Sequence, residues 1–174
     1  MELDFLYLLQ NLHNDLLNTI MVFITSLGDG GIVWLSMAVV MLVFKKTRLC
    51  GITIMAGMAL SLLLGNLFLK NVIARPRPCA VDSTVKLLIP YPSEYSFPSG
   101  HTLHGFTAAT AIFLYFKKAR IGALLLAAAI AVSRMYLFVH YPTDILGGIL
   151  LGILDAMIAY TIVQKIMRKR EEKP

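Results

Sequence analysis

Long apolar runs separated by short clusters of basic residues constrain the fold of this chain more than any other feature. Of its 174 residues, 57% are hydrophobic and only 15% are charged. A soluble domain of this size could not bury so much apolar surface, whereas runs near the ~20 residues needed to cross a bilayer can face lipid. The sequence therefore predicts a single all-α membrane domain over residues 1–174.

The apolar runs predict six transmembrane helices preceded by an amphipathic helix. Residues 1–15 carry leucines at helical spacing with polar residues between them, which predicts an interfacial helix or a partly buried first turn of the next one. The predicted spans are residues 16–27, 32–44, 50–73, 99–116, 121–138 and 143–166. The first is the weakest, because a dozen residues cover only about 18 Å of a hydrocarbon core roughly 30 Å thick. The Gly28-Asp29-Gly30-Gly31 segment is predicted to form a tight turn after it.

The basic residues predict how the chain is oriented. Of the 16 Lys and Arg residues, 11 fall in the segments 45–48, 117–120 and 165–173, which six spans would place on one side. Basic loops remain cytoplasmic, so the loops 70–101 and 134–144 are expected at the extracytoplasmic face of a plasma (inner) membrane. This distribution explains the net charge of +6 better than a nucleic-acid partner does.

Several single residues carry structural predictions. Cys50 and Cys79 would lie at opposite membrane faces and are expected to form no disulfide. Residues 1–14 contain no Lys or Arg, so a signal peptide is not expected and the N-terminus should be retained. Gly148 and Gly152 predict close helix packing, and Asp155 predicts a structural hydrogen bond between spans.

Charged and titratable residues concentrate at the ends of the apolar runs. Arg134, His140 and Asp144 lie within eleven residues of one another, next to hydrocarbon. Such groups are costly without partners, so they mark a functional site that binds something anionic. On the predicted topology Lys70 and Arg77, with the Pro98–His101 segment, reach the same face.

The pattern across these segments is Lys-x6-Arg-Pro from Lys70, Pro-Ser-Gly-His from Pro98 and Ser-Arg-x5-His-x3-Asp from Ser133. It resembles, complete and in order, the three signature motifs of the type 2 phosphatidic acid phosphatase superfamily, which includes vanadium haloperoxidases and glucose-6-phosphatase-like enzymes. The resemblance covers residues 66–150 by motif, and the six-span layout extends it to most of the chain.

The residue types suit phosphoryl transfer on physical grounds as well. A transferring phosphoryl group spreads negative charge over its oxygens and needs fixed donors around it. Lys70, Arg77 and Arg134 supply charge, and Ser99 supplies a hydroxyl and is a good N-cap. The amides that open the following helix lack intrahelical partners and can bind an anion, and Gly100 permits close approach.

The resemblance implies three catalytic residues. His140 is the implied nucleophile, giving a phosphohistidine, and Asp144 would orient its imidazole. His101 would protonate the leaving oxygen and then activate water. No metal and no cofactor are expected, since a two-metal site would need several nearby carboxylates.

Other polar residues have plainer interpretations. Lys70 and Arg134, taken alone, would be interpreted as snorkelling residues. Arg75 also precedes a proline, but the motif spacing selects Arg77. His104 follows His101 by three residues and is expected to be packed or hydrogen-bonded rather than catalytic, and His13 is expected at the interface.

Together these features predict a metal-independent membrane phosphatase acting on a lipid phosphate at the extracytoplasmic face. Polyprenyl diphosphate, phosphatidylglycerophosphate and phosphatidic acid resemble the substrates of the family, and short loops favour access from the bilayer. Two alternatives remain open: a phosphatase for a soluble phosphomonoester, and a phosphate-binding transporter without catalysis.

Overall fold

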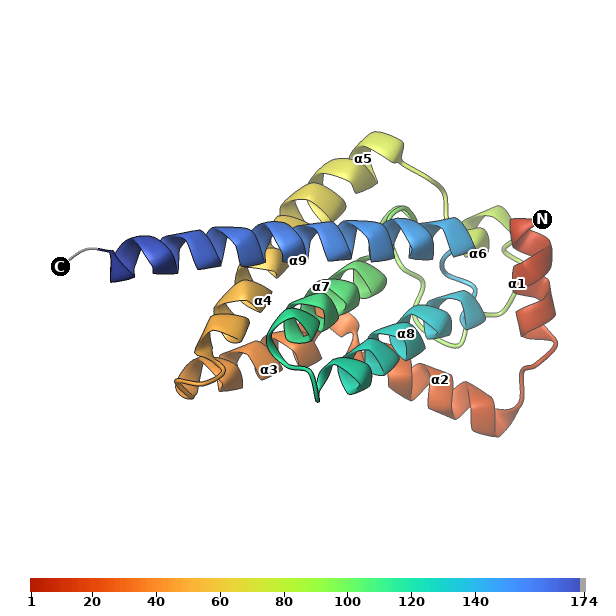
Figure 1. The fold of residues 1–174 in the computed structure, drawn as a ribbon. Helices are drawn as coiled ribbons and strands as arrows, with labels where there is room; N and C mark the ends of the chain where they lie inside the picture. Colours follow the sequence, from red (N-terminus) through yellow and green to blue (C-terminus); the bar gives the residue numbers. More distant parts are fainter. Residues whose placement is uncertain (173–174) are drawn as a thin grey trace.

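The computed structural model describes residues 1–172, which are helical apart from short connections and contain no strand (Figure 1). The N-terminal half contains α1 (Glu2–Gln10), α2 (Asp15–Leu27), a 3-10 turn η1 (Asp29–Gly31), α3 (Ile32–Val43) and α4 (Arg48–Ser61). Helix α4 continues through a π-helix η2 (Leu62–Leu69) into α5 (Lys70–Ile73). The remaining helices are α6 (Pro78–Val81), α7 (Gly100–Tyr115), α8 (Arg120–Tyr136) and α9 (Pro142–Glu171). The all-α prediction is confirmed.

Helix α7 is the centre of the bundle and packs against α4, α8 and α9. Glycines on α9 allow the closest of these contacts. A Cβ at Gly152 would lie 2.6 Å from the Leu103 carbonyl oxygen, and one at Gly148 would lie 3.0 Å from that of Ser99. The two helices could not approach this closely with larger residues, which confirms the predicted role of this glycine pair.

A buried polar cluster joins the same helices deeper in the bundle. Ser61 of α4 donates a hydrogen bond to Asp155 Oδ2 of α9 (2.7 Å), and its hydroxyl also lies 2.8 Å from that of Thr107 in α7. The predicted interspan hydrogen bond of Asp155 is therefore confirmed.

The two cysteines occupy separate cores. Cys50 packs with Trp34 and Ile54 in the core formed by α3, α4, α7 and α8. Cys79 packs with Leu6 and Phe138 in a second core that ties α1 to the α8–α9 connection. Both are free thiols, in agreement with the prediction that they form no disulfide.

The number of membrane spans differs from the prediction. Two helical segments within residues 1–172 are long and apolar enough to cross a bilayer: Arg48–Val81, which includes a non-helical break at residues 74–77, and Pro142–Arg170. The pair α2 and α3 becomes a third if counted as one bent segment. Helices α7 and α8, with 16 and 17 residues, lie at the short end of the lengths found for spanning helices, which average ~20 residues. Six spans are not confirmed.

Helices α2 and α3 do not run in opposite directions, as two successive spans joined by a tight turn would. They are bent by only 43° relative to each other, so the second continues in nearly the direction of the first. Gly30 and Gly31 make the connection with φ of +57° and +70°, a left-handed conformation that glycine adopts without strain. The tight turn was correctly predicted, but it bends the chain and does not reverse it.

The predicted single helix over residues 1–15 is also broken. Helix α1 ends at Gln10, and α2 begins after Asn14, whose side-chain Oδ1 accepts a hydrogen bond from the Leu17 amide at 3.0 Å. Gln10 Nε2 donates to the Tyr136 carbonyl at the end of α8, so α1 is attached to the bundle at that end (Figure 1).

The glycine contacts yield a stability prediction. Gly152→Ala should lower the unfolding free energy by about 1–3 kcal/mol, because its Cβ would overlap a backbone oxygen that cannot move cheaply. Gly122→Ala in α8 is the matched control, since nothing lies within 4 Å of its Cβ, and it should be neutral or stabilising. Thermal unfolding in detergent measures both, and equal effects would contradict the close α7–α9 contact.

Candidate active site

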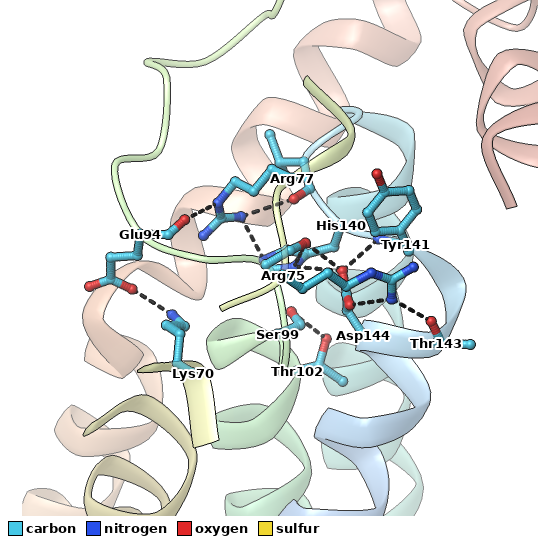
Figure 2. A network of polar contacts seen from close by, with 12 residues as sticks. Lys70, Arg75, Arg77, Glu94, Ser99, Thr102, His140, Tyr141, Thr143 and Asp144 are labelled. Atoms are coloured by element: carbon cyan, nitrogen blue, oxygen red, sulfur yellow. Dashed lines mark hydrogen bonds and ion pairs between the residues drawn. The ribbon is translucent and has the colours of Figure 1, made fainter. Parts of the chain in front are cut away.

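A cavity of about 310 Å³ lies among the ends of α5, α7 and α8 and the segment before α9. Six of the eight residues predicted for the site line it: Lys70, Arg77, Gly100, His101, Arg134 and His140. These residues come from three separate segments of the chain, as predicted. Figure 2 shows the polar network around the cavity.

Three buried cations face this cavity. Lys70, Arg77 and Arg134 are 5%, 6% and 4% exposed. Arg134 Nη1 donates to Thr25 Oγ1 at 2.6 Å, while its buried Nε has no partner within the part of the chain that the structure describes. Burial of three cations around one cavity is costly unless an anion binds there.

Glu94 pairs with the first of these cations, a contact that sequence reasoning missed. Lys70 Nζ donates to Glu94 Oε2 at 2.5 Å, and Arg77 Nε donates to the Glu94 carbonyl at 2.6 Å (Figure 2). The hydrogen bond from Lys70 lowers the pKa of the Glu94 carboxyl. Glu94 lies in the long segment between α6 and α7, where no periodic pattern indicates a partner.

Ser99 holds a different position from the one predicted. It is the N-cap residue of α7 by position, but its side chain makes no capping hydrogen bond. Its fully buried hydroxyl accepts from Thr102 Oγ1 at 3.0 Å, and it does not line the cavity. The neighbouring Gly100 does line the cavity, so the helix N-terminus itself faces the site.

His140 lies between the cations and a buried carboxylate. Its Nε2 accepts from Arg77 Nη1 at 3.0 Å on the cavity side, and its Nδ1 lies 3.5 Å from Asp144 Oδ2 on the other (Figure 2). Burial lowers the pKa of His140 to about 3, so the imidazole is neutral at neutral pH. A neutral ring held from behind by a carboxylate can act as a nucleophile through Nε2 once Arg77 exchanges this hydrogen bond for one to a bound anion.

Asp144 is fully buried and held by several donors. It occupies the third position of α9 and accepts from the Tyr141 amide at 2.8 Å, as in a capping box. Ser96 Oγ donates to the same carboxylate oxygen, and Arg75 Nη1 donates to the other at 2.8 Å. Sequence reasoning assigned neither residue to Asp144.

His101 has its own carboxylate partner. Its Nε2 lies 2.9 Å from Asp29 Oδ1 in the turn between α2 and α3. Sequence reasoning treated Asp29 only as a turn residue, because nothing in the spacing links position 29 to position 101. The site thus contains two histidine–carboxylate pairs, His140–Asp144 and His101–Asp29.

His104 was predicted to be packed or hydrogen-bonded. Its ring is largely buried and lines the same cavity, and its Nε2 has no hydrogen-bond partner within residues 1–172. That it takes no part in catalysis stays a prediction.

The model of the PAP2 superfamily matches residues 49–168, which is more than half of the chain and includes all three motifs. The chain belongs to the PAP2 superfamily. This confirms the family that the motifs resembled, the type 2 phosphatidic acid phosphatase superfamily.

Known PAP2 relatives match most of the chain. It is 37% identical over 137 residues to the undecaprenyl-diphosphatase of Sulfolobus acidocaldarius, covering 78% of this chain and 66% of that protein. The PAP2-type phosphatidylglycerolphosphate phosphatase from Bacillus subtilis superposes with a TM-score of 0.77 at 27% identity, covering 95% and 85% of the two chains. Aquifex aeolicus LpxE superposes with a TM-score of 0.74 at 29% identity, covering 92% and 94%.

Helix α1, which lies outside the matched residues 49–168, is connected directly to the residues around Asp144. Glu2 Oε2 pairs with Arg75, the residue that also holds Asp144, and Glu2 Oε1 accepts from the Thr143 amide and hydroxyl at 3.1 and 2.8 Å. The Arg75 guanidinium also lies 3.9 Å above the centre of the Tyr141 ring. The N-terminal helix thereby contributes to the surroundings of Asp144.

Removing the Glu2 charge should loosen this connection. Glu2→Gln should cost about 1 kcal/mol of stability, because the ion pair is partly exposed, and should speed hydrogen exchange in residues 2–10. Asp4→Asn is the control, since Asp4 is exposed and pairs with the N-terminal amine. Hydrogen exchange that is equally fast in both variants would contradict a specific role for Glu2.

Proposed function

We propose that this protein hydrolyses a lipid phosphate ester or diphosphate through a phosphohistidine intermediate. The observation that carries the proposal is the His140–Asp144 pair, with His140 Nε2 directed into a cavity lined by three buried cations. Catalysis by a nucleophile requires an imidazole held in this orientation, whereas simple anion binding does not.

The proposed reaction proceeds in two steps. His140 Nε2 attacks phosphorus, the bond to the leaving oxygen breaks, and His101 gives that oxygen a proton. Water then attacks the phosphohistidine while His101 takes its proton, which releases inorganic phosphate and restores both histidines.

Fixed donors would stabilise the transferring group in both steps. Four residues that line the cavity, Lys70, Arg77, Arg134 and Gly100 through its amide, would hold the three equatorial oxygens of the phosphoryl group. Ser99 would support the turn before α7 from behind, instead of contacting phosphate as the motif implies. Asp144 would stabilise the positive charge that develops on His140.

A lipid substrate suits the site better than a soluble one. Relatives of this chain carry the names undecaprenyl-diphosphatase and phosphatidylglycerophosphatase B, the second matching 90% of the chain at 30% identity. The exposed apolar residues of η2, Leu62–Leu64, Leu67 and Phe68, lead along the helix surface to Lys70 at the cavity. A phosphate on a membrane lipid could therefore reach the cations without leaving the bilayer surface.

Replacing the proposed nucleophile tests this function. His140→Ala should reduce phosphate release from prenyl diphosphate or phosphatidylglycerophosphate at least 10³-fold, because no other group can take its place. His13→Ala, a histidine outside the cavity, is the control and should retain activity. Near wild-type turnover in His140→Ala would overturn the proposal.

The same assay tests the expectation that no metal is needed. Among residues 1–172, no group of three or more His, Cys, Asp or Glu side chains is placed to hold a metal ion. Activity is therefore expected to persist in a chelator, and a loss that Mg²⁺ restores would overturn the metal-free scheme.

We further propose five membrane crossings, with the site and the N-terminus on the extracytoplasmic side. Helices α2 and α3 would make one bent crossing, followed by α4–α5, α7, α8 and α9. The basic segments 45–48, 117–120 and 165–173 then share the cytoplasmic side, as positive-inside orientation requires. The contact between Glu2 and Arg75 supports an N-terminus beside the site.

Labelling single introduced cysteines with a membrane-impermeant reagent tests this topology. The native cysteines are buried and should react little, so Asp4→Cys, Lys46→Cys and Ser83→Cys provide exposed thiols. Asp4→Cys and Ser83→Cys should be labelled in intact cells, and Lys46→Cys only after permeabilisation. Protection of Asp4→Cys together with Lys46→Cys would instead support six crossings.

A further inference from the structure

Two polar side chains line the cavity beyond the groups already given a role. Asn66 and His104 both face it, and Asn66 Oδ1 and His104 Nε2 are buried without a hydrogen-bond partner within residues 1–172. Buried polar groups are normally paired, so unpaired ones in a cavity wall indicate contact with a ligand.

Each residue lies about one helical turn deeper in the bundle than a phosphate-binding group on the same helix, measured from the end where the loops 74–99 and 137–141 lie. Asn66 precedes Lys70 by four residues in the continuous helix α4–η2–α5, and His104 follows His101 by three residues in α7. A Cβ at Gly100 would lie 3.2 Å from Asn66 Oδ1, so Asn66 adjoins the N-terminus of α7. They therefore form a second polar layer, on the side of the cavity nearer the middle of the bundle.

The local backbone around Asn66 is unusual. It lies inside the π-helix Leu62–Leu69, although the segments on both sides are α-helical. A π-helix is rare and occurs frequently at functional sites, where it changes which side chains face the interior. This supports a ligand-binding role for Asn66.

We infer that Asn66 and His104 bind the lipid-proximal phosphoryl group of a lipid diphosphate, an inference that rests on the proposed function. The terminal phosphoryl group lies among Lys70, Arg77 and Arg134, furthest from the lipid chain. The second phosphoryl group must then lie deeper, past His101. There the Nδ2 group of the Asn66 amide and an N–H of the His104 ring can donate hydrogen bonds to its oxygens, whereas Asn66 Oδ1 can only accept, for example from a bound water.

This arrangement discriminates between substrates. With a monophosphate, the first carbons of the lipid chain would occupy the second layer and leave both polar groups unpaired. A site built to hydrogen-bond a substrate group rejects the analogue that lacks it, because its own buried groups lose their partners. The protein is therefore a diphosphatase by preference.

The test compares initial phosphate release from a prenyl diphosphate and a prenyl monophosphate of the same chain length, using the full chain in detergent. Asn66→Leu and His104→Phe should each lower kcat/KM for the diphosphate about tenfold or more, with the monophosphate changed less than threefold. His104→Gln, which keeps a donor, should recover part of the loss. Asn71→Leu is the control, because Asn71 is exposed on α5 and outside the cavity.

The outcomes are separable. Equal losses on both substrates, or no change on either, would overturn the inference, as would a wild-type protein that prefers the monophosphate. Release from neither prenyl substrate nor from phosphatidylglycerophosphate by the wild-type protein would instead overturn the proposed lipid phosphatase function. If thermal unfolding shows that Asn66→Leu or His104→Phe does not fold, the smaller changes Asn66→Ser and His104→Asn take their place. The ratio of kcat/KM for the diphosphate to kcat/KM for the monophosphate is then measured on these variants, and an unchanged ratio would overturn the inference.

A third substrate distinguishes a phosphoryl subsite from a general polar one. Phosphatidylglycerophosphate places a glycerol with one free hydroxyl next to the reacting phosphate, and its second anion, the phosphodiester, is three carbons away. Its kcat/KM should fall less than threefold in Asn66→Leu, and a loss as large as that for the diphosphate would overturn the assignment to a phosphoryl group.

Discussion

The buried carboxylate of Asp144 joins the segments of chain that make up the site. It receives hydrogen bonds from Arg75 after α5, Ser96 before α7 and the Tyr141 amide, and it faces His140. A buried carboxylate is stable only with such a set of partners, and removing any of them would leave charge uncompensated. The position of the His140 ring therefore depends on the loop after α5 and the loop before α7, in addition to its own segment.

The sequence predicted that most of the motif residues lie together, because they occur at fixed spacings near the ends of helices. Lys70, Arg77, His101, Arg134 and His140 do line one cavity. Their partners Asp29, Glu94, Ser96 and Glu2 were not predicted, since each lies in a turn, loop or terminal helix. Pairs such as Glu2–Thr143, separated by 141 positions, exist only after the chain has folded.

The bend between α2 and α3 shows where hydropathy alone is insufficient. Two apolar runs separated by a glycine-rich turn are compatible with a hairpin or with one bent segment, because glycine permits either direction. Tertiary contacts select the bend: Asp29 pairs with His101, and Thr25 accepts from Arg134. The same contacts bring the α2–α3 connection to the wall of the cavity. The bend between these helices and the composition of the cavity wall therefore depend on the same side-chain contacts.

The two histidine–carboxylate pairs differ in a way that matches their proposed roles. His140 is completely enclosed, with its carboxylate partner equally buried, which holds one nitrogen toward the cavity in a neutral ring. His101 pairs with Asp29, whose side chain is largely exposed, so this second pair has access to water. A nucleophile benefits from a dry, fixed environment, whereas a group that first donates a proton and then takes one from water requires exchange with solvent. The unequal burial of Asp144 and Asp29 thus supports the two roles proposed for the histidines.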